Sequence, residues 1–222
     1  MELYLVRHGE SLSNLGLEHS PDTALSPAGE EQADLLGKRL AGVRFDRIYA
    51  SHLKRAVQTA AAVARHQPGE PEIVVVPELA ERGTPLDLEA DVAFHRSVYP
   101  NLVYTKTAME TDYHGDLERA EAALELCVYR PAFGAAAQVE RRGETEIRSN
   151  PERVLITAHG GFNACLLSSL IGFRFDVNRN IVQHNTCVNR FELFLYNGVP
   201  RIRFISYNDV EHLPARLRPE KD

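Results

Sequence analysis

The sequence has little of three features that mark large classes of protein. Its 222 residues include three cysteines, Cys127, Cys165 and Cys187, which are far apart and form no Cys-x-x-Cys pair. No stretch approaches the ~20 apolar residues of a membrane span, and no basic start precedes an apolar segment. We therefore expect reduced thiols and a cytoplasmic location, and we predict that the protein neither enters nor crosses a membrane by itself.

Concentrated positive charge is also absent. Lys and Arg number 25 against 31 Asp and Glu, a net charge of −6 at pH 7, and 44% of the residues are hydrophobic, as in ordinary globular proteins. A basic cluster near the end of the chain, around Arg216, Arg218 and Lys221, is interleaved with Glu220, and we interpret it as a solvated tail. A nucleic-acid partner is not expected, because such partners are bound by a basic patch or stripe.

Two stretches of the chain share one pattern, a short apolar strand that ends in His-Gly. Residues 1–6 run into Arg7-His8-Gly9, and residues 154–158 run into His159-Gly160-Gly161 and a helical pattern. Open α/β sheets bind ligands at the carboxyl ends of their strands. If the two strands are neighbours in one parallel sheet, both imidazoles and Arg7 point into one crevice with helix N-termini behind them. Such a crevice attracts anions.

The chain between these stretches alternates predicted helices and strands. Ser26-Pro27 predicts the start of an amphipathic helix, residues 45–50 predict a strand, and Ser51 begins an Ala-rich helix through Arg65. Arg55 lies about one turn into that helix, near enough to the end of the strand to aim its guanidinium into the crevice. An exposed surface arginine is the alternative interpretation of Arg55.

The remaining patterns complete a prediction of the fold class. Residues 73–76 predict a strand and 116–130 a helix, and two strands flank Asn197-Gly198, a strong hairpin signal. We predict one α/β domain over residues 1–222: a mostly parallel mixed sheet flanked by helices on both faces, a terminal antiparallel hairpin, and a helical, cap-like insertion at about residues 85–150 over the site. A hairpin at the edge of the sheet can pair with the same edge of a second chain, so the sequence leaves open whether the protein forms a homo-oligomer.

Three motifs in this order resemble the histidine phosphatase superfamily, also called the phosphoglycerate-mutase-like family. They are Leu5-Val6-Arg7-His8-Gly9-Glu10-Ser11 with Asn14, then Ser51-x-Leu53-x-Arg55-Ala56-x-Gln58-Thr59, then Ala158-His159-Gly160-Gly161. Each motif follows a predicted strand. The resemblance covers Met1 to Leu79 and Arg153 to about Tyr207, and it leaves the middle of the chain poorly covered.

The resemblance implies hydrolysis of a small-molecule phosphate monoester through a phosphohistidine, with no metal and no cofactor. A phosphate monoester is a dianion that resists nucleophiles, so its oxygens must be neutralised and its leaving oxygen protonated. By analogy with the family, His8 attacks phosphorus and His159 donates to the developing charge from the opposite side. The implied phosphate-binding groups are Arg7, Asn14, Arg55 and the Gly160 backbone.

The general acid follows from the resemblance less directly. The family carries it at the Glu of a Leu-x-Glu-Arg-like segment, which falls on Glu81. The Gly-x-x-Glu-Gly pattern that often follows in the family is missing here, so Glu78, Asp87 and Glu89 remain alternatives. Several residues in the insertion could contact the rest of the substrate, and surface or packing roles are the alternative. These candidates are residues 99–106, Tyr113, His114, Arg141 and Arg142.

Two other functions are weighed against the phosphatase. A phosphoglycerate mutase would return the phosphoryl group to substrate, but Ser13 stands where those mutases typically carry Trp, and their long basic substrate-binding segment is not recognisable. A non-catalytic phosphate-binding module would keep the arginines and could dispense with the nucleophile. The presence of both histidines and both arginines favours the phosphatase.

Overall fold

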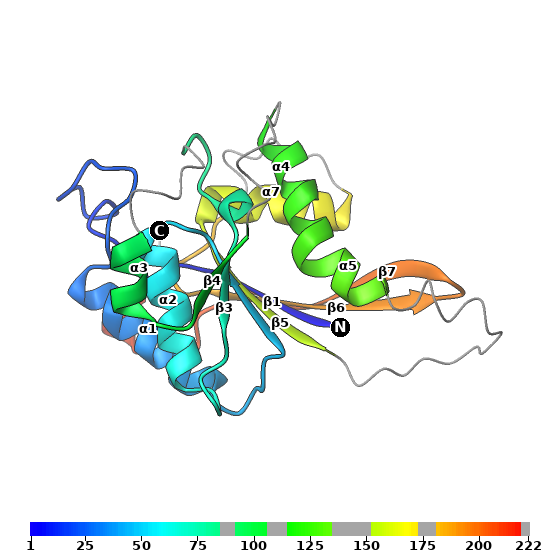
Figure 1. The fold of residues 1–222 in the computed structure, drawn as a ribbon, viewed down its shortest axis with the longest axis horizontal. Coiled ribbons are helices and arrows are strands. Elements are labelled where there is room, and N and C mark those ends of the chain that lie inside the picture. The colour runs from blue at the N-terminus through cyan, green and yellow to red at the C-terminus, as the bar shows by residue number, and fades with distance from the viewer. Residues whose placement is uncertain (85–91, 106–114, 135–151, 173–180, 219–222) are drawn as a thin grey trace.

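A seven-stranded sheet forms the centre of the molecule, with strand order β4-β3-β2-β5-β1-β6-β7 (Figure 1). The structure, a computed structural model, describes residues 1–84, 92–105, 115–134, 152–172 and 181–218. The strands are β1 (Glu2–Arg7), β2 (Arg47–Ala50), β3 (Ile73–Val75), β4 (Leu102–Tyr104), β5 (Arg153–Ala158), β6 (Val188–Tyr196) and β7 (Val199–Asp209). Only β6 runs against its neighbours, and the other pairings in the described sheet are parallel.

Helices cover both faces of this sheet. Figure 1 shows α1, α2 and α3 on one side and α4, α5 and α7 on the other. The helices are α1 (Pro27–Leu40), α2 (Lys54–Arg65), α3 (Val92–Val98), α4 (Asp116–Leu124), α5 (Arg130–Phe133) and α7 (Gly160–Ile171), with 3-10 turns η1 (Pro77–Leu79) and η6 (Ala215–Leu217) and the π-helical turn η4 (Glu125–Tyr129). Within the described ranges, none of the helices combines the length and the apolarity that crossing a membrane requires.

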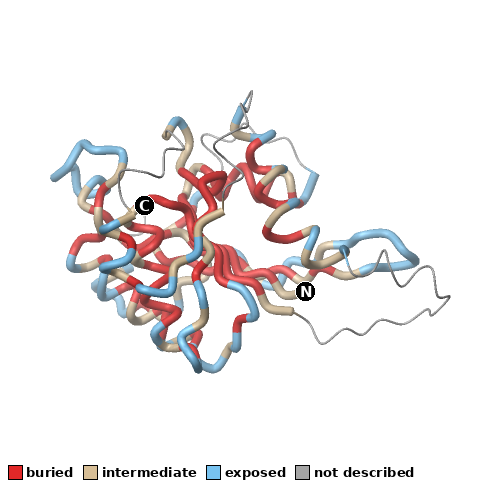
Figure 2. The backbone as a smooth tube through the Cα atoms, viewed as in Figure 1, coloured by how far each residue is buried: buried red, intermediate tan, exposed pale blue. Residues whose placement is uncertain are grey.

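The alternation of side chains along β1 divides the core in two. Leu3 and Leu5 pack with the α4 and α7 side, whereas Tyr4 and Val6 pack with the α1 and α2 side. All four side chains are buried, in keeping with a strand covered on both faces. Figure 2 shows the central strands, which include β1 and β5, as buried along nearly their whole length, whereas β7 is largely exposed. A strand held this tightly fixes the position of whatever follows it, here Arg7 and His8.

The predicted fold class is confirmed, including the mostly parallel mixed sheet and the antiparallel hairpin. The hairpin turn has positive φ at both central residues, 52° at Asn197 and 71° at Gly198, as a two-residue primed turn requires. Ser26 caps α1 by accepting a hydrogen bond from the Gly29 amide at 3.0 Å. The division into one domain with an insertion stays a prediction, because residues 85–91, 106–114 and 135–151 lie outside the described residues.

Three local predictions were wrong or incomplete. The second helix begins at Lys54 rather than at Ser51, so Arg55 is its second residue and does not lie a full turn inside it. Strand β4 was not predicted. Tyr99, which precedes it, is buried in the core, and its hydroxyl donates to the Pro71 carbonyl at 2.9 Å. The helix predicted over residues 116–130 is divided into α4, the π-helical turn η4 and α5, and it extends to Phe133.

Gly29, in the first turn of α1, allows the helix to pack directly on the loop that follows His8. A Cβ at Gly29 would lie 1.9 Å from the Glu10 carbonyl oxygen, a contact that only movement of the backbone can relieve. We therefore expect Gly29→Ala to lower the free energy of unfolding by about 3 kcal/mol or more. Urea unfolding measures this, with Gly42→Ala as control, since nothing lies within 4 Å of a Cβ there. Equal midpoints for the two variants would contradict the prediction.

Candidate active site

His8 lies directly after β1 with its side chain 3% exposed. Its Nδ1 is 2.6 Å from the Gly9 carbonyl oxygen, which can only accept, so Nδ1 carries the proton. Its Nε2 receives a hydrogen bond from Arg55 Nε at 3.2 Å, and a guanidinium can only donate. The two bonds select one tautomer, with the lone pair on Nε2. That lone pair is a nucleophile whose direction is fixed.

The backbone around His8 is fixed by side chains from distant parts of the chain. The Gly9 amide donates to Thr59 Oγ1 at 3.0 Å, and the Thr59 hydroxyl donates to the Arg55 carbonyl at 2.7 Å. The His8 carbonyl accepts from Asn185 Nδ2 at 3.0 Å, and the Thr186 amide donates to the Arg7 carbonyl at 3.0 Å. These bonds hold the turn that aims the imidazole.

His159 lies beside His8 because their strands are hydrogen-bonded neighbours, with Arg7 opposite Ala158 in the parallel register. The two ring centroids are 5.1 Å apart. Ser51 Oγ is 2.9 Å from His159 Nε2, while Nδ1 is buried without a hydrogen-bond partner. A buried polar atom of this kind costs free energy unless a ligand satisfies it. The two imidazoles therefore lie side by side, both buried, at the ends of the two neighbouring strands.

Burial, followed by the positive charge of Arg55, holds the pKa of both histidines well below the usual 6.5. The charge of Arg7 acts on both rings in the same direction. Both imidazoles are therefore neutral near neutral pH. A neutral His8 keeps the Nε2 lone pair that a nucleophile needs.

The neutral, buried imidazoles predict a loss of stability in acid. In the unfolded chain each imidazole takes up a proton near pH 6.5, whereas in the folded protein each imidazole takes up a proton only at a much lower pH. Their contribution to stability is thus present above pH 6.5 and is lost as the pH falls towards the folded pKa. Each histidine should account for up to about 1.4 kcal/mol per pH unit in that window.

Urea unfolding between about pH 7 and about pH 5 measures this effect. The variant with both His8→Gln and His159→Gln should lose less stability over that range than the wild type does. Equal losses in the two proteins would contradict the assignment of the acid sensitivity to these two rings.

Two arginines, the buried Arg55 and the partly buried Arg7, stand beside the two neutral imidazoles. Arg7 Nη1 donates to the Gln183 carbonyl, and its Nε is buried without a partner. Arg55 is 7% exposed and Nη1 donates to the Pro21 carbonyl at 2.8 Å. Neither guanidinium donates to a carboxylate in the described part of the chain. Burying two cations without an anion is costly, so the arrangement indicates an anion-binding site.

Gly160, the first residue of α7, lies against Arg7. A Cβ at Gly160 would be 3.2 Å from Arg7 Nε, so the absence of a side chain lets the guanidinium approach the helix N-terminus. An N-terminus of this kind favours negative charge. Arg7 and Gly160 are therefore brought together as the sequence motifs require.

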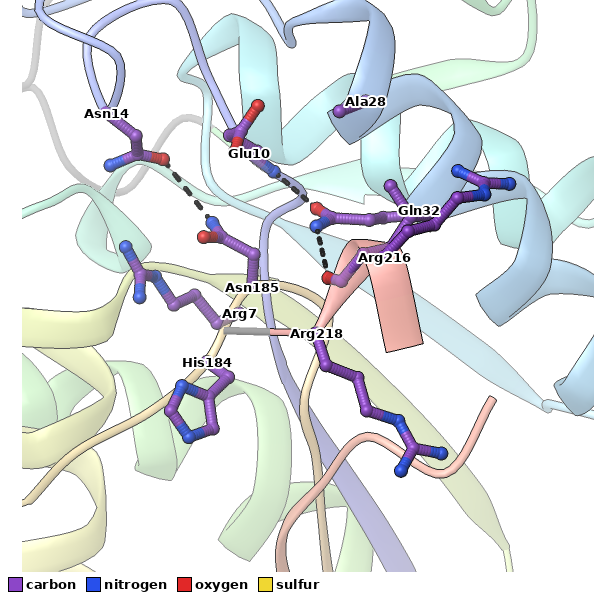
Figure 3. A pocket seen from close by; sticks show the side chains of 10 residues that line it. Arg7, Glu10, Asn14, Ala28, Gln32, His184, Asn185, Arg216 and Arg218 are labelled. Atoms are coloured by element: carbon purple, nitrogen blue, oxygen red, sulfur yellow. Dashed lines mark hydrogen bonds between the residues drawn. The ribbon is translucent and has the colours of Figure 1, made fainter. Parts of the chain in front are cut away.

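Asn14 lies at the outer edge of the site and is exposed. Its Oδ1 accepts from the Ser11 amide at 3.0 Å and from Asn185 Nδ2 at 3.3 Å (Figure 3). A cavity of about 370 Å³ opens beside it, lined by Arg7, Asn14 and Asn185 together with α1 and the segment 216–218. The C-terminal segment was expected to be a solvated tail, but Gln32 Nε2 donates to the Leu217 carbonyl at 3.2 Å and ties it to α1.

The carboxylate of Glu81 lies at the N-terminus of α7, the helix that directly follows His159 in the chain. Oε1 accepts from the Phe162 amide at 3.0 Å and from the Arg82 amide at 2.9 Å, and Oε2 accepts from the Gly161 amide at 3.4 Å. Its negative charge acts on both Arg7 and Arg55. Glu81 is thus close to the two arginines, on the side of α4, where Asp116 accepts from the neighbouring Arg82.

The alternatives to Glu81 are placed differently. Glu78 is 2% exposed. The pKa of the Cys127 thiol is raised mainly by burial and further by the negative charge of Glu78. Cys127 belongs to the core formed with α4 and α7, so the Glu78 carboxylate lies beside that core. Asp87 and Glu89 lie outside the described residues, as do Tyr113, His114, Arg141 and Arg142.

Several residues around the site were not predicted. Ser51 was expected to start a helix, but it is the partner of His159. Asn185 donates to the His8 carbonyl from 177 residues away, and the Thr186 amide donates to the Arg7 carbonyl. No local sequence pattern indicates that either residue belongs to the site. In the described ranges, no cluster of three or more His, Cys, Asp or Glu side chains could hold a metal ion.

The fold and the site together define a class: an α/β protein in which two buried histidines and two arginines meet at the carboxyl ends of neighbouring parallel strands. The model of the histidine phosphatase superfamily (branch 1) matches residues 3–90 and 133–205, more than half of the chain. The chain belongs to this superfamily, which confirms the resemblance seen in its motifs.

Individual relatives agree with this membership. Human "Serine/threonine-protein phosphatase PGAM5, mitochondrial" is 32% identical over 130 residues, which are 58% of this chain and 40% of that protein. "Probable phosphoglycerate mutase GpmB" of Erwinia tasmaniensis is 26% identical over 200 residues, 86% of this chain and 85% of that protein. A crystal structure of phosphoserine phosphatase from Entamoeba histolytica covers 96% of this chain and 99% of its own, with TM-score 0.61 and 21% identity. That structure supports the fold.

Proposed function

We propose that this protein hydrolyses phosphate monoesters of small metabolites through a phosphohistidine on His8. One observation carries the proposal: the bond from Nδ1 to the Gly9 carbonyl leaves the lone pair of a neutral imidazole on Nε2, in contact with the Arg55 guanidinium and within the field of Arg7. A neutral nucleophile beside unpaired cations suits attack on a dianion, because the cations neutralise the oxygens that would repel the nucleophile.

In the first step, Arg55 Nε exchanges its hydrogen bond to His8 Nε2 for one to a phosphoryl oxygen, and the freed Nε2 lone pair forms a bond to phosphorus as the ester P–O bond breaks. Arg7 and Arg55 hold phosphoryl oxygens by forked, charge-assisted hydrogen bonds. His159 donates from Nδ1, since the Ser51 hydroxyl can donate to its Nε2. The electron pair of the broken bond goes to the leaving oxygen, which takes the proton of Glu81 in its acid form.

In the second step, water replaces the alcohol. The Glu81 carboxylate takes a proton from the water as its oxygen attacks phosphorus, and the N–P bond breaks with its electron pair returning to Nε2. Inorganic phosphate leaves and Glu81 is again protonated. Neither step uses a metal or a cofactor, and the groups that act all come from the chain itself.

Trapping of the phosphoenzyme tests this function. Wild-type protein is mixed with a radiolabelled aryl phosphate in EDTA, quenched within milliseconds, and separated from free label. We expect an acid-labile, alkali-stable label that peptide mapping assigns to the segment containing His8 and that decays as inorganic phosphate appears. Absence of both label and turnover over several monoesters, although inorganic phosphate still binds, would favour a phosphate-binding module.

A mutase function is the second candidate, favoured by the similarity to the protein named GpmB over 86% of this chain. Ser13 stands at the position where the mutases carry Trp, and it is exposed. Incubation with 3-phosphoglycerate and a trace of 2,3-bisphosphoglycerate separates the two functions. The phosphatase releases inorganic phosphate, whereas a mutase forms 2-phosphoglycerate without it.

We also propose a cytoplasmic location for the protein. The three cysteines are free and buried, and burial raises the pKa of Cys165 to about 11 and of Cys187 to about 12, so these two stay as thiols near neutral pH. Cysteines that form no disulfide are expected in a reducing compartment. Fractionation of cells that express the tagged chain tests the location, and recovery in an organelle fraction would contradict it.

A further inference from the structure

Arg119, on α4, is a buried arginine that the mechanism above does not use. It is 5% exposed, and its guanidinium lies among backbone groups of the segment that leads into Glu81. Nη1 donates to the Glu78 carbonyl at 3.1 Å and to the Ala80 carbonyl at 2.8 Å. One guanidinium nitrogen therefore holds the two carbonyls on either side of Leu79, and the second of them immediately precedes Glu81.

The same guanidinium also holds the surface that receives the Glu81 carboxylate. Its central carbon lies 4.1 Å from the centre of the Phe162 ring, a cation–π contact with a fully buried aromatic side chain. The amide of Phe162 is the donor to Glu81 Oε1 at 3.0 Å. Arg119 thus contacts both the segment that carries the carboxyl group and the helix turn that binds it.

Asp116 fixes Arg119 in this position. Its Oδ1 accepts from Arg119 Nη2 at 2.7 Å, and its Oδ2 accepts from Arg82 Nε at 2.8 Å. The amide of Arg82 in turn donates to Glu81 Oε1 at 2.9 Å. One carboxylate at the start of α4 therefore ties together Arg82, which follows Glu81 in the chain, and Arg119, which holds the carbonyl that precedes it.

We propose that Arg119, held by Asp116, is a positioning residue for Glu81 and sets where that carboxyl group stands relative to the leaving oxygen. The proposal rests on the phosphatase function proposed above. A purely structural Arg119 would only fasten α4 to the sheet, and its loss would then affect every substrate alike. A positioning Arg119 matters most when the leaving oxygen needs a proton.

The leaving group separates these two roles. The phenol of p-nitrophenyl phosphate leaves as a stable anion, whereas the alkoxide of glycerol phosphate must be protonated as it leaves. We expect Arg119→Met to lower kcat/KM for glycerol phosphate about 10- to 100-fold, within the range that general acid catalysis contributes, and for p-nitrophenyl phosphate less than about threefold. The ratio kcat/KM reports the first, phosphorylating step, in which Glu81 acts as the acid.

A double-mutant cycle strengthens the assignment. Glu81→Gln should lower kcat/KM for glycerol phosphate at least as much as Arg119→Met, and adding Arg119→Met to it should cost less than about threefold more, because both changes remove the same proton transfer. Asp116→Asn should give a smaller loss with the same dependence on the leaving group. It keeps one acceptor oxygen and serves where Arg119→Met does not fold.

Arg130→Met is the matched control, because Arg130 is an exposed arginine paired with Glu125 at 3.8 Å. It should leave both rates unchanged, and urea midpoints are measured for every variant. Equal losses for the two esters, or no loss, would overturn the positioning role. If the wild type hydrolyses neither ester and forms no phosphoenzyme, the phosphatase function itself falls, and this proposal falls with it.

Discussion

Replacing His8 by alanine should lower kcat/KM for phosphate monoesters by at least about 10⁴-fold and abolish the phosphoenzyme, because no other group supplies the attacking lone pair. The neighbouring His159 does not replace it, since its Nε2 is 2.9 Å from Ser51 Oγ and its ring is fully buried. What remains is the electrostatic cradle, which accelerates the attack of water only weakly compared with the covalent route. Initial rates with an aryl phosphate measure the loss.

Binding of inorganic phosphate separates loss of the nucleophile from loss of the site. Arg7, Arg55 and His159 stay in place in the His8→Ala variant, so calorimetry should find its dissociation constant for phosphate within about threefold of the wild-type value. His66→Ala is the matched control, because His66 lies at the end of α2 and pairs with Asp34 at 2.9 Å. Retention of a tenth of the activity in the His8→Ala variant would assign the nucleophile elsewhere.

The parts of the site that the sequence predicted are those fixed by local pattern. His8 and His159 could be placed because each ends a short apolar strand, and strand ends in a parallel sheet share one edge. Their actual distance, 5.1 Å between ring centroids, follows from the pairing of β1 with β5, which the repeated pattern suggests but does not determine. The hairpin at Asn197-Gly198 was predictable for the same reason, since its turn chemistry is local.

The parts that the sequence did not predict depend on contacts between distant segments. Asn185 donates to the His8 carbonyl across 177 residues, and an asparagine in a turn has many local uses. Arg119 lies within the predicted helix 116–130, where no local pattern distinguishes a buried arginine from an exposed one, and only the packing of α4 against α7 buries it. Ser51 had the composition of a helix cap, and its tertiary bond to His159 overrides that preference.

The electrostatics of the crevice explain why neither arginine donates to a carboxylate among the described residues. A carboxylate hydrogen-bonded to Arg55 would neutralise it and would compete with the phosphate that the site is proposed to bind. In the structure, Glu81 acts on Arg55 only through space while its oxygens are taken up by the amides of α7. The positive charge therefore stays available, and it also holds the pKa of His8 low, after burial as the main cause.

Replacing Arg55 by alanine should lower kcat/KM by about 10³- to 10⁵-fold, the range measured when an arginine that stabilises a phosphoryl transition state is absent. The loss has two sources: the phosphoryl oxygens lose a forked donor, and His8 Nε2 loses the partner that holds it at 3.2 Å. Arg55→Lys should recover little of this, because one ammonium group cannot reproduce two parallel donors from a planar guanidinium. Arg65→Ala, at the exposed end of the same helix, should change the rate less than about twofold.

The pH profile of Arg55→Ala provides a readout that general damage to the fold would not give. The charge of Arg55 contributes to the low pKa of His8, so its removal should raise that pKa. The acid limb of kcat/KM reports protonation of the free nucleophile, and it should therefore move to higher pH in Arg55→Ala but stay in place in Arg65→Ala. A limb that does not move, together with a loss of less than about tenfold, would show that Arg55 acts on neither the phosphate nor His8.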